Sequence, residues 1–408
     1  MSYLKTKHVL FRHQNFLNLF LGRFISAIGD KVFTIALAVW VVTSNNQDAK
    51  LHLGLLLAMN TIPIVLFGPL AGTLADRFDR KACMLFANAS RFLTLVFTLI
   101  LLLRGDLTIM HMYFISFILA MFVPLFESSA NASISSLVTQ DDLAKAVATD
   151  GSVLSMSQII GASLGGLLVA TIHFEGALVF NALTFALSFF FVKRIRTKLL
   201  TQKNNANSYL SEIIKGLYFV FSNKALKSLL FIFGFVNFFT ASIFILIPFL
   251  VRYHFNLPTA QWIGIYEVSF ALGAGITTIG FSFIKSHKKI YFKMTGALIL
   301  FGIGFILTGN ISFAWIVCIF LFASGVGLAI VNTLALVLFQ HSIQEDMKGR
   351  FFAILGSVAL SAIPLSYIVT GYISSFISAS SLFSIYGIMI VLIASSLAFI
   401  PRLKNEIG

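Results

Sequence analysis

Several ionisable residues lie inside the long apolar stretches of this 408-residue chain. A charged side chain at the centre of a membrane costs about 2.5–3.5 kcal/mol on insertion scales, so each one needs a partner or a function. A buried carboxylate can bind and release a proton, and a nearby cation can hold it ionised. These residue types therefore indicate ion pairing and proton transfer within a membrane. The residues are Arg23, Asp30, Lys31, Arg91, Glu127 and Glu267.

Depth separates these residues into two groups. At a helical rise of about 1.5 Å per residue, Arg23, Arg91 and Glu127 lie roughly 10–15 Å from one membrane surface. We predict that the two guanidinium groups hold Glu127 ionised between them, as a structural network or an inner-leaflet gate. Asp30 lies deeper, at roughly 23 Å. Because adjacent helical residues do not share a face, Lys31 points away from it.

Asp30 is the first proton-coupling candidate, because its fixed partner is the least obvious, and Glu127 is the second. Arg23, Lys31 and Arg91 are the buried charge partners. A buried ion pair between Asp30 and a lysine is the alternative. Glu267 lies about 10 Å from the outer surface and is expected to face water.

Composition requires membrane helices to position these side chains. The chain is 58% hydrophobic and 11% charged, with a mean hydropathy of +0.94, which excludes a soluble protein. Backbone groups in hydrocarbon must be satisfied within each apolar run, so the runs are helices. The net charge of +14 is spread over alternate loops, which argues against nucleic acid binding. The two cysteines, Cys83 and Cys318, provide no disulfide framework or metal site.

Twelve transmembrane helices are predicted. Twelve spans place both termini on one side, and Lys and Arg residues concentrate in the loops of that side, while the opposite loops hold Lys50, Arg104 and Arg252. Both termini are therefore expected in the cytoplasm, with the chain in the plasma membrane. The predicted spans are 14–42, 53–75, 82–103, 108–135, 146–172, 176–192, 226–250, 261–284, 291–308, 311–339, 350–374 and 380–400.

The chain is predicted to consist of two six-helix halves, 1–192 and 226–408. A basic cytoplasmic linker, 193–225, separates them, and its end enters an amphipathic stretch, 209–227, typical of a helix at a membrane surface. The loops around Gln140 and Gln344 are similar and lie half a chain length apart, which indicates an internal repeat. Transporters use such repeats to build a site at their interface.

A charged loop follows the second apolar stretch. Residues 72–81 read Gly-x-x-x-Asp-Arg-x-x-Arg-Lys, which resembles the loop signature of the major facilitator superfamily of transporters. The superfamily often has Gly where Asp79 stands, although Asp there resembles the branch of macrolide-efflux proteins and the enterobactin exporter. A cationic loop that only sets topology is the alternative. The resemblance implies an all-α membrane protein with twelve transmembrane helices in the major facilitator fold.

The resemblance also implies a conformational latch. Asp76 would sit against the start of the eleventh helix, expected near Gly349 and Arg350, with Arg80 bonded nearby when the cytoplasmic side is closed. The residues assigned to this latch are Gly72, Asp76, Arg77, Arg80, Lys81, Gly349 and Arg350.

A glycine-rich segment in the fifth span reads Gly161-Ala-Ser-Leu-Gly165-Gly166. It resembles the antiporter signature of the superfamily's exporters, with Ala162 in place of proline. Glycines at this spacing let two helices approach closely, so ordinary packing is the alternative. In the superfamily, helices 1, 4, 7 and 10 line the central cavity. The cavity candidates, besides the carboxylates, are Trp40, Asn237 and Asn332.

Function follows from these features. The chain has no HExxH motif, P-loop or nucleophile elbow, so neither an enzyme nor an ATP-driven pump is predicted, and no cofactor or metal is expected. We predict a secondary active transporter that exports amphiphilic small molecules, such as a drug, macrolide or siderophore, in exchange for protons. The alternative is a protein of the same fold that flips lysophospholipids or similar lipids. A membrane sensor or scaffold is a third class. Membrane lipids are expected to surround the protein in each case.

Overall fold

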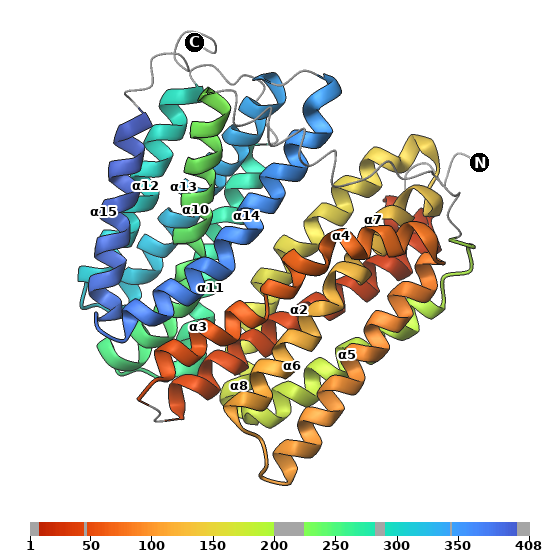
Figure 1. Cartoon of the computed structure of the whole chain (residues 1–408), viewed down its shortest axis with the longest axis horizontal. Helices are drawn as coiled ribbons and strands as arrows, with labels where there is room; N and C mark the ends of the chain where they lie inside the picture. Colours follow the sequence, from red (N-terminus) through yellow and green to blue (C-terminus); the bar gives the residue numbers. More distant parts are fainter. Residues whose placement is uncertain (1–7, 45–46, 200–223, 282–289, 343–344, 398–408) are drawn as a thin grey trace. The chain divides into compact units, whose positions relative to one another are not determined.

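Helices make up most of the chain that the structure describes. The computed structural model describes residues 8–44, 47–199, 224–281, 290–342 and 345–397 (Figure 1). Within these residues there are no strands, nine spans are long and apolar enough to cross a membrane, and two shorter apolar helices follow, Val358–Ser374 and Ala379–Ser395. The predicted all-α class is confirmed. The count of twelve transmembrane helices stays a prediction.

The chain divides into two compact units. Unit 1 comprises Met1–Thr43 and Leu55–Asn205, and unit 2 comprises Ser44–Gly54 and Ala206–Gly408. The predicted halves and linker remain a hypothesis, and most of the linker, including much of its amphipathic stretch, lies outside the described residues. The helices of unit 1 are α1 (Val9–Arg12), α2 (Gln14–Thr43), the end of α3 (Ala49–Met59), α4 (Ile62–Arg77), α5 (Arg80–Leu103), α6 (Ile109–Met121), α7 (Val123–Leu137) and α8 (Gln140–Lys193). Those of unit 2 are α10 (Lys224–Phe249), the π-helix η1 (Leu250–His254), α11 (Thr259–Phe281), α12 (Ile290–Asn310), α13 (Ala314–Ser342), α14 (Glu345–Ser374) and α15 (Ala379–Leu397).

Prolines divide two of the predicted spans. The second span is two helices, α3 and α4, because Pro63 lies in the first turn of α4. Similarly, Pro124 begins a new helix, α7, after α6. Proline has no amide hydrogen to donate and is favoured at the start of a helix, so the chain restarts there. In α8 the break between the fifth and sixth spans lies at His173, whose backbone is left-handed (φ 56°).

Unit 1 is organised around α2. This helix packs against both limbs of α8, the parts before and after the break at His173. Three glycines permit the close approach. A Cβ on Gly161 of α8 would lie 2.7 Å from Lys31 Cβ, and one on Gly29 of α2 would meet the side chain of Thr184. A Cβ on Gly165 would lie 3.4 Å from the Cα of Val32. These glycines let α2 and α8 approach closely, and the resemblance of the segment to an antiporter signature stays a prediction.

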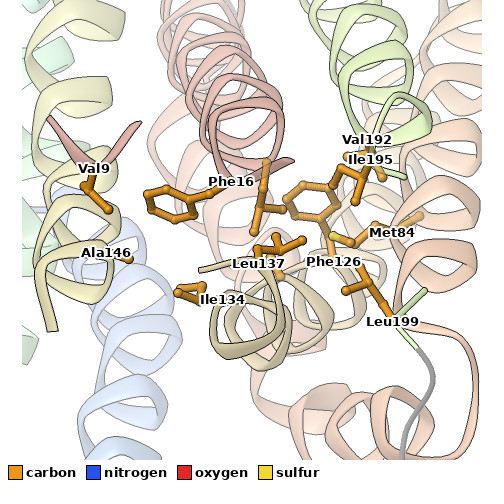
Figure 2. Packing of buried hydrophobic residues seen from close by; sticks show 13 residues of the cluster. Val9, Phe16, Met84, Phe126, Ile134, Leu137, Ala146, Val192, Ile195 and Leu199 are labelled. Carbon is orange, nitrogen blue, oxygen red and sulfur yellow. The ribbon is translucent and has the colours of Figure 1, made fainter. Parts of the chain in front are cut away.

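An apolar cluster closes one end of unit 1. It draws buried side chains from α1, α2, α5, α7 and both ends of α8 and continues into the chain just after α8 (Figure 2). Phe16 and Phe126 are its largest members and are almost fully buried. The cluster holds the helix ends that carry the charged residues described below. Its members are Val9, Phe16, Leu19, Met84, Ala87, Phe126, Ala130, Ile134, Leu137, Ala146, Val192, Ile195 and Leu199.

Unit 2 packs through glycines and aromatic rings. Helix α13 packs against both α11 and α12, and α12 packs against α15. A Cβ on Gly325 of α13 would collide with the backbone of Phe270 and lie 2.9 Å from Ala274 N. Phe305 contacts the rings of Phe301 and Phe383, at centroid distances of 4.9 and 5.3 Å. This interior is apolar over most of its described length.

Candidate functional site

Asp30 of α2 is paired with Arg91 of α5. Arg91 Nη2 donates to both carboxylate oxygens of Asp30 at 2.6 Å. The guanidinium carbon of Arg91 also lies 4.1 Å from the centre of the Phe185 ring, a cation–π contact from the second limb of α8. Arg91 is buried, while the Asp30 side chain is 41% exposed. One charge of each sign makes this pair electrically balanced.

Arg23 of α2 binds two carboxylates. Its Nη2 donates to Glu127 Oε2 on α7, and its Nε lies 3.3 Å from the other oxygen of Glu127. The remaining nitrogen, Nη1, donates to Asp150 Oδ2 on α8. A planar guanidinium suits this forked arrangement, because its N–H donors point in fixed directions. We call these three residues the Arg23 triad.

This pairing corrects the predicted network. Glu127 does not lie between two guanidinium groups, because Arg91 bonds to Asp30 instead. Asp30 therefore has a fixed partner, and that partner is an arginine rather than a lysine. The estimated depths of Arg91 and Asp30 differ by roughly 8–13 Å, a gap that the long arginine side chain helps to bridge. Lys31 is buried elsewhere, with its Cβ against Gly161.

Asp150 is the member of the site that the sequence analysis missed. It lies four residues inside the predicted fifth span, yet it was not included among the ionisable residues expected within the membrane. In the structure it is 7% exposed and bonded to Arg23. A carboxylate inside the first turns of a predicted span was the signal that could have found it.

A second polar cluster ties the start of α2 to the start of α8. Arg12 Nη1 and His13 Nε2 lie 2.5 and 3.0 Å from Asp142 Oδ2. Asp142 is buried beside the apolar cluster of Figure 2, in which Val9, Leu137 and Ala146 also pack. The cluster therefore fixes one end of α2 against α8.

The loop signature is tied down within unit 1. Asp79 caps α5, because its carboxylate accepts from Lys81 N at 3.0 Å, which gives a physical reason for Asp at this position. Arg80 Nη1 donates to Ala132 O at 2.7 Å, and Lys81 Nζ donates to Ile195 O at 2.6 Å. Both bonds reach helix ends of the same unit.

The proposed latch residues themselves are more exposed. Asp76 and Arg77, in the last turn of α4, are exposed, and Gly72 is partly exposed in the preceding turn. Helix α14 begins at Glu345, so Gly349 and Arg350 lie in its second turn rather than at its start. Acidic residues favour a helix N-terminus, which explains the earlier start. The structure describes the backbone of Gly349 and Arg350 but not their surroundings, so the latch stays a prediction.

The cavity candidates have separate surroundings. Trp40 stacks on Phe174 at 5.4 Å, a contact between α2 and α8 within unit 1. Asn237 donates to Phe233 O of its own helix at 2.8 Å. Asn332 lines a cavity of 480 Å³ between α11 and α13, within unit 2. The structure therefore does not bring these three residues together within either unit.

Glu267 differs from expectation. It was expected to face water, but it is 6% exposed in α11. Its neighbour Tyr266 is also buried and donates to Ala314 O at 3.1 Å, which anchors this end of α11 to α13. Glu267 therefore belongs to the interior of unit 2.

Comparisons with known proteins place this arrangement in context. A sequence profile described as Major Facilitator Superfamily matches residues 19–363. Macrolide efflux protein A of Streptococcus pyogenes is 24% identical over 401 residues, covering 96% of each chain. The provisionally named bacilysin exporter BacE of Bacillus subtilis is 25% identical over 396 residues, covering 95% of this chain and 94% of that one. The solved structure of the nucleoside transporter NupG matches with a TM-score of 0.74 at 16% identity, over 94% of this chain and 98% of that one, which shows the fold.

Proposed function

The chain belongs to the Major Facilitator Superfamily of membrane transporters, and from this premise we propose that it exports amphiphilic small molecules in exchange for protons. Its apolar helices and its family make it an integral membrane protein. Both termini are proposed to lie in the cytoplasm, with the protein in the plasma membrane, following the distribution of Lys and Arg between loops.

Export is supported by the relatives. Two proteins that align with nearly the whole chain are named for efflux or export, one of macrolides and one of bacilysin. These names differ in substrate, so they support the direction of transport more strongly than a particular compound. The sequence of residues 161–166, which resembles an antiporter signature, favours the same direction.

Proton exchange rests on one observation, the arginine–carboxylate pairs inside unit 1. Asp30 and Glu127, the proton-coupling candidates, lie on membrane-spanning helices and are each bonded to a buried arginine. Charges this deep are costly, and in transporters they commonly mark proton or ion pathways. Protonation of either carboxylate would remove its negative charge and weaken its ion pair with an arginine. This supplies a chemical step that could be linked to a conformational change.

Reconstitution tests this function. The purified protein, inserted into liposomes, should move radiolabelled erythromycin, a macrolide, against its gradient when a pH gradient is imposed. A protonophore should abolish this movement, and a sodium gradient should not replace the pH gradient. Transport driven by sodium, or independent of both gradients, would contradict proton exchange.

The substrate class needs a parallel screen. Thermal shift with a panel of macrolides, siderophores and lysophospholipids identifies ligands, because a ligand stabilises the state it binds. We expect amphiphilic drugs to raise the melting temperature most. Stabilisation by lysophospholipids alone, with their transfer between leaflets in liposomes, would favour the lipid-handling alternative.

A further inference from the structure

The two ion-pair sites of unit 1 differ in charge balance. The pair of Asp30 and Arg91 has one charge of each sign. The Arg23 triad has one guanidinium for two carboxylates, so it carries one excess negative charge if both are ionised. A buried uncompensated charge is costly, and such a site lowers its free energy by binding a cation.

Asp150 has an oxygen ready to receive that cation. Its Oδ2 accepts from Arg23, whereas its Oδ1 is buried and has no hydrogen-bond partner among the residues that the structure describes. The side chain is 8% exposed, compared with 33% for Glu127. Buried polar atoms without a partner are uncommon in native proteins, and one at a site with excess negative charge points to a ligand.

Nearby charges do not cancel the excess. Along α2, the next charged residues are Asp30 and Lys31, about two turns from Arg23, and Asp30 is bonded to Arg91 of α5. Along α8, Asp142 lies about two turns from Asp150 and is bonded to Arg12 and His13, and Lys145 is exposed. On α7, the charged group that faces the site is Glu127 itself.

The geometry points to the Arg23 triad as the proton-binding site of the transporter, with one proton bound at Asp150 Oδ1. This inference rests on the proposed function for its role in transport. Binding forms one O–H bond on Asp150 and leaves Arg23 paired with Glu127 alone, a balanced pair. Release restores the excess negative charge. Glu127, a third exposed, is the carboxylate that stays paired with Arg23 when Asp150 is protonated.

A proton suits this site better than a metal cation. A sodium or calcium ion needs several oxygen ligands, whereas the positively charged Arg23 guanidinium occupies the space between the two carboxylates. A proton needs a single oxygen. Sodium binding is therefore an outcome that the test must distinguish.

Infrared spectroscopy tests proton binding without any substrate. The purified full-length protein, titrated from mildly acidic to mildly alkaline pH, should show the carbonyl stretch of a protonated carboxylic acid at neutral pH. Asp150→Asn should lose this band, because its amide leaves the balanced pair of Arg23 and Glu127. Asp30→Asn and the matched control Asp141→Asn, an exposed residue on the same helix, should keep it.

Transport measurements separate this inference from the proposed function. In liposomes, Asp150→Asn should lose uphill export while downhill movement of the probe persists. If wild type is not driven by a pH gradient, the proposed function fails, yet the infrared band still decides whether the triad binds a proton. If Asp150→Asn fails to fold, Asp150→Glu provides the test instead. It keeps a protonatable group, so it should show the carboxylic acid band at a shifted frequency.

Three results would overturn the inference. The first is the absence of a protonated carboxyl from wild type at every pH at which it is folded. The second is loss of the band in Asp30→Asn rather than in Asp150→Asn, which would assign the proton to the deeper pair. The third is displacement of the band by sodium ions at constant pH, which would make the triad a sodium site.

Discussion

Units 1 and 2 have similar all-helical construction but different interiors. Among the described residues, unit 1 buries five charged side chains, and unit 2 buries one, Glu267. Unit 1 joins α2, α5, α7 and α8 through ion pairs, whereas unit 2 joins its described helices mainly through glycine–backbone contacts and edge-to-face aromatic contacts. The five buried charged residues of unit 1 are Arg23, Lys31, Arg91, Asp142 and Asp150.

This difference suggests a division of labour. Ion pairs can be changed by adding or removing a proton, whereas close backbone packing of glycines offers no such switch. Unit 1 is therefore suited to coupling transport to an ion, and unit 2 to holding helices in fixed contact. The predictions below test this division through changes that should affect one unit and not the other.

Removal of Arg23 should have the largest effect. Arg23→Met leaves the buried Asp150 and the partly exposed Glu127 without their counter-charge, and breaking a buried pair in this way costs about 3–5 kcal/mol. We expect a large drop in the melting temperature of the detergent-purified protein. Adding Glu127→Gln and Asp150→Asn to this variant should restore most of the stability. If Arg23→Met alone is as stable as wild type, the ion pairs of the triad do not stabilise the protein.

Substitution of a glycine at a helix contact in unit 2 should cause the next largest loss of stability. In Gly325→Ala, the new Cβ meets the backbone of α11, which cannot move aside, so we expect a loss of about 1–3 kcal/mol. In unit 1, Gly165→Ala should cost less, because the nearest atom, Ile35 Cδ1 at 2.8 Å, ends a flexible side chain. The control is Gly296→Ala, with nothing within 4 Å of its Cβ. Equal losses in the first two variants would contradict the contrast between units.

A substitution in the proposed latch should lower transport and leave stability unchanged. Asp76 is exposed, so Asp76→Asn should leave membrane insertion and melting temperature near wild type. Transport should fall to roughly a tenth or less, equivalent to about 1.4 kcal/mol in the barrier. Asp106→Asn, in the exposed turn after α5, is the matched control. Normal transport by Asp76→Asn would remove the latch from the mechanism.

The smallest effect is expected at the cap of α5. Asp79→Ala removes the acceptor for Lys81 N and should lower stability by about 1 kcal/mol. Asp79→Ser can still cap the helix and should stay within a few tenths of a kcal/mol of wild type. Thermal unfolding of both variants provides the measurement. An equally destabilised Asp79→Ser would show that the charge, rather than the cap, matters here.

The helical spans and most of the ionisable site residues of this protein could be predicted from its sequence. Apolar runs in a membrane must be helical, so the span positions followed from composition, and each predicted span falls on a helix or a pair of helices in the described chain. The close approach at Gly161 and Gly165 also followed from residue type, because glycine has no side chain to separate two helices. The ionisable residues of the site, apart from Asp150, were identified for the same kind of reason.

Only the tertiary structure decided which charges pair. Counting residues along a helix gives the depth of a side chain, but the direction in which it points depends on how the helix is rotated against its neighbours. That rotation is set by packing contacts such as Gly29 against Thr184. It turned Arg91 toward Asp30, and it brought Asp150, near the start of the fifth span, to Arg23. The charge imbalance of the Arg23 triad therefore arises from helix rotation, which depends on contacts between residues far apart in the chain.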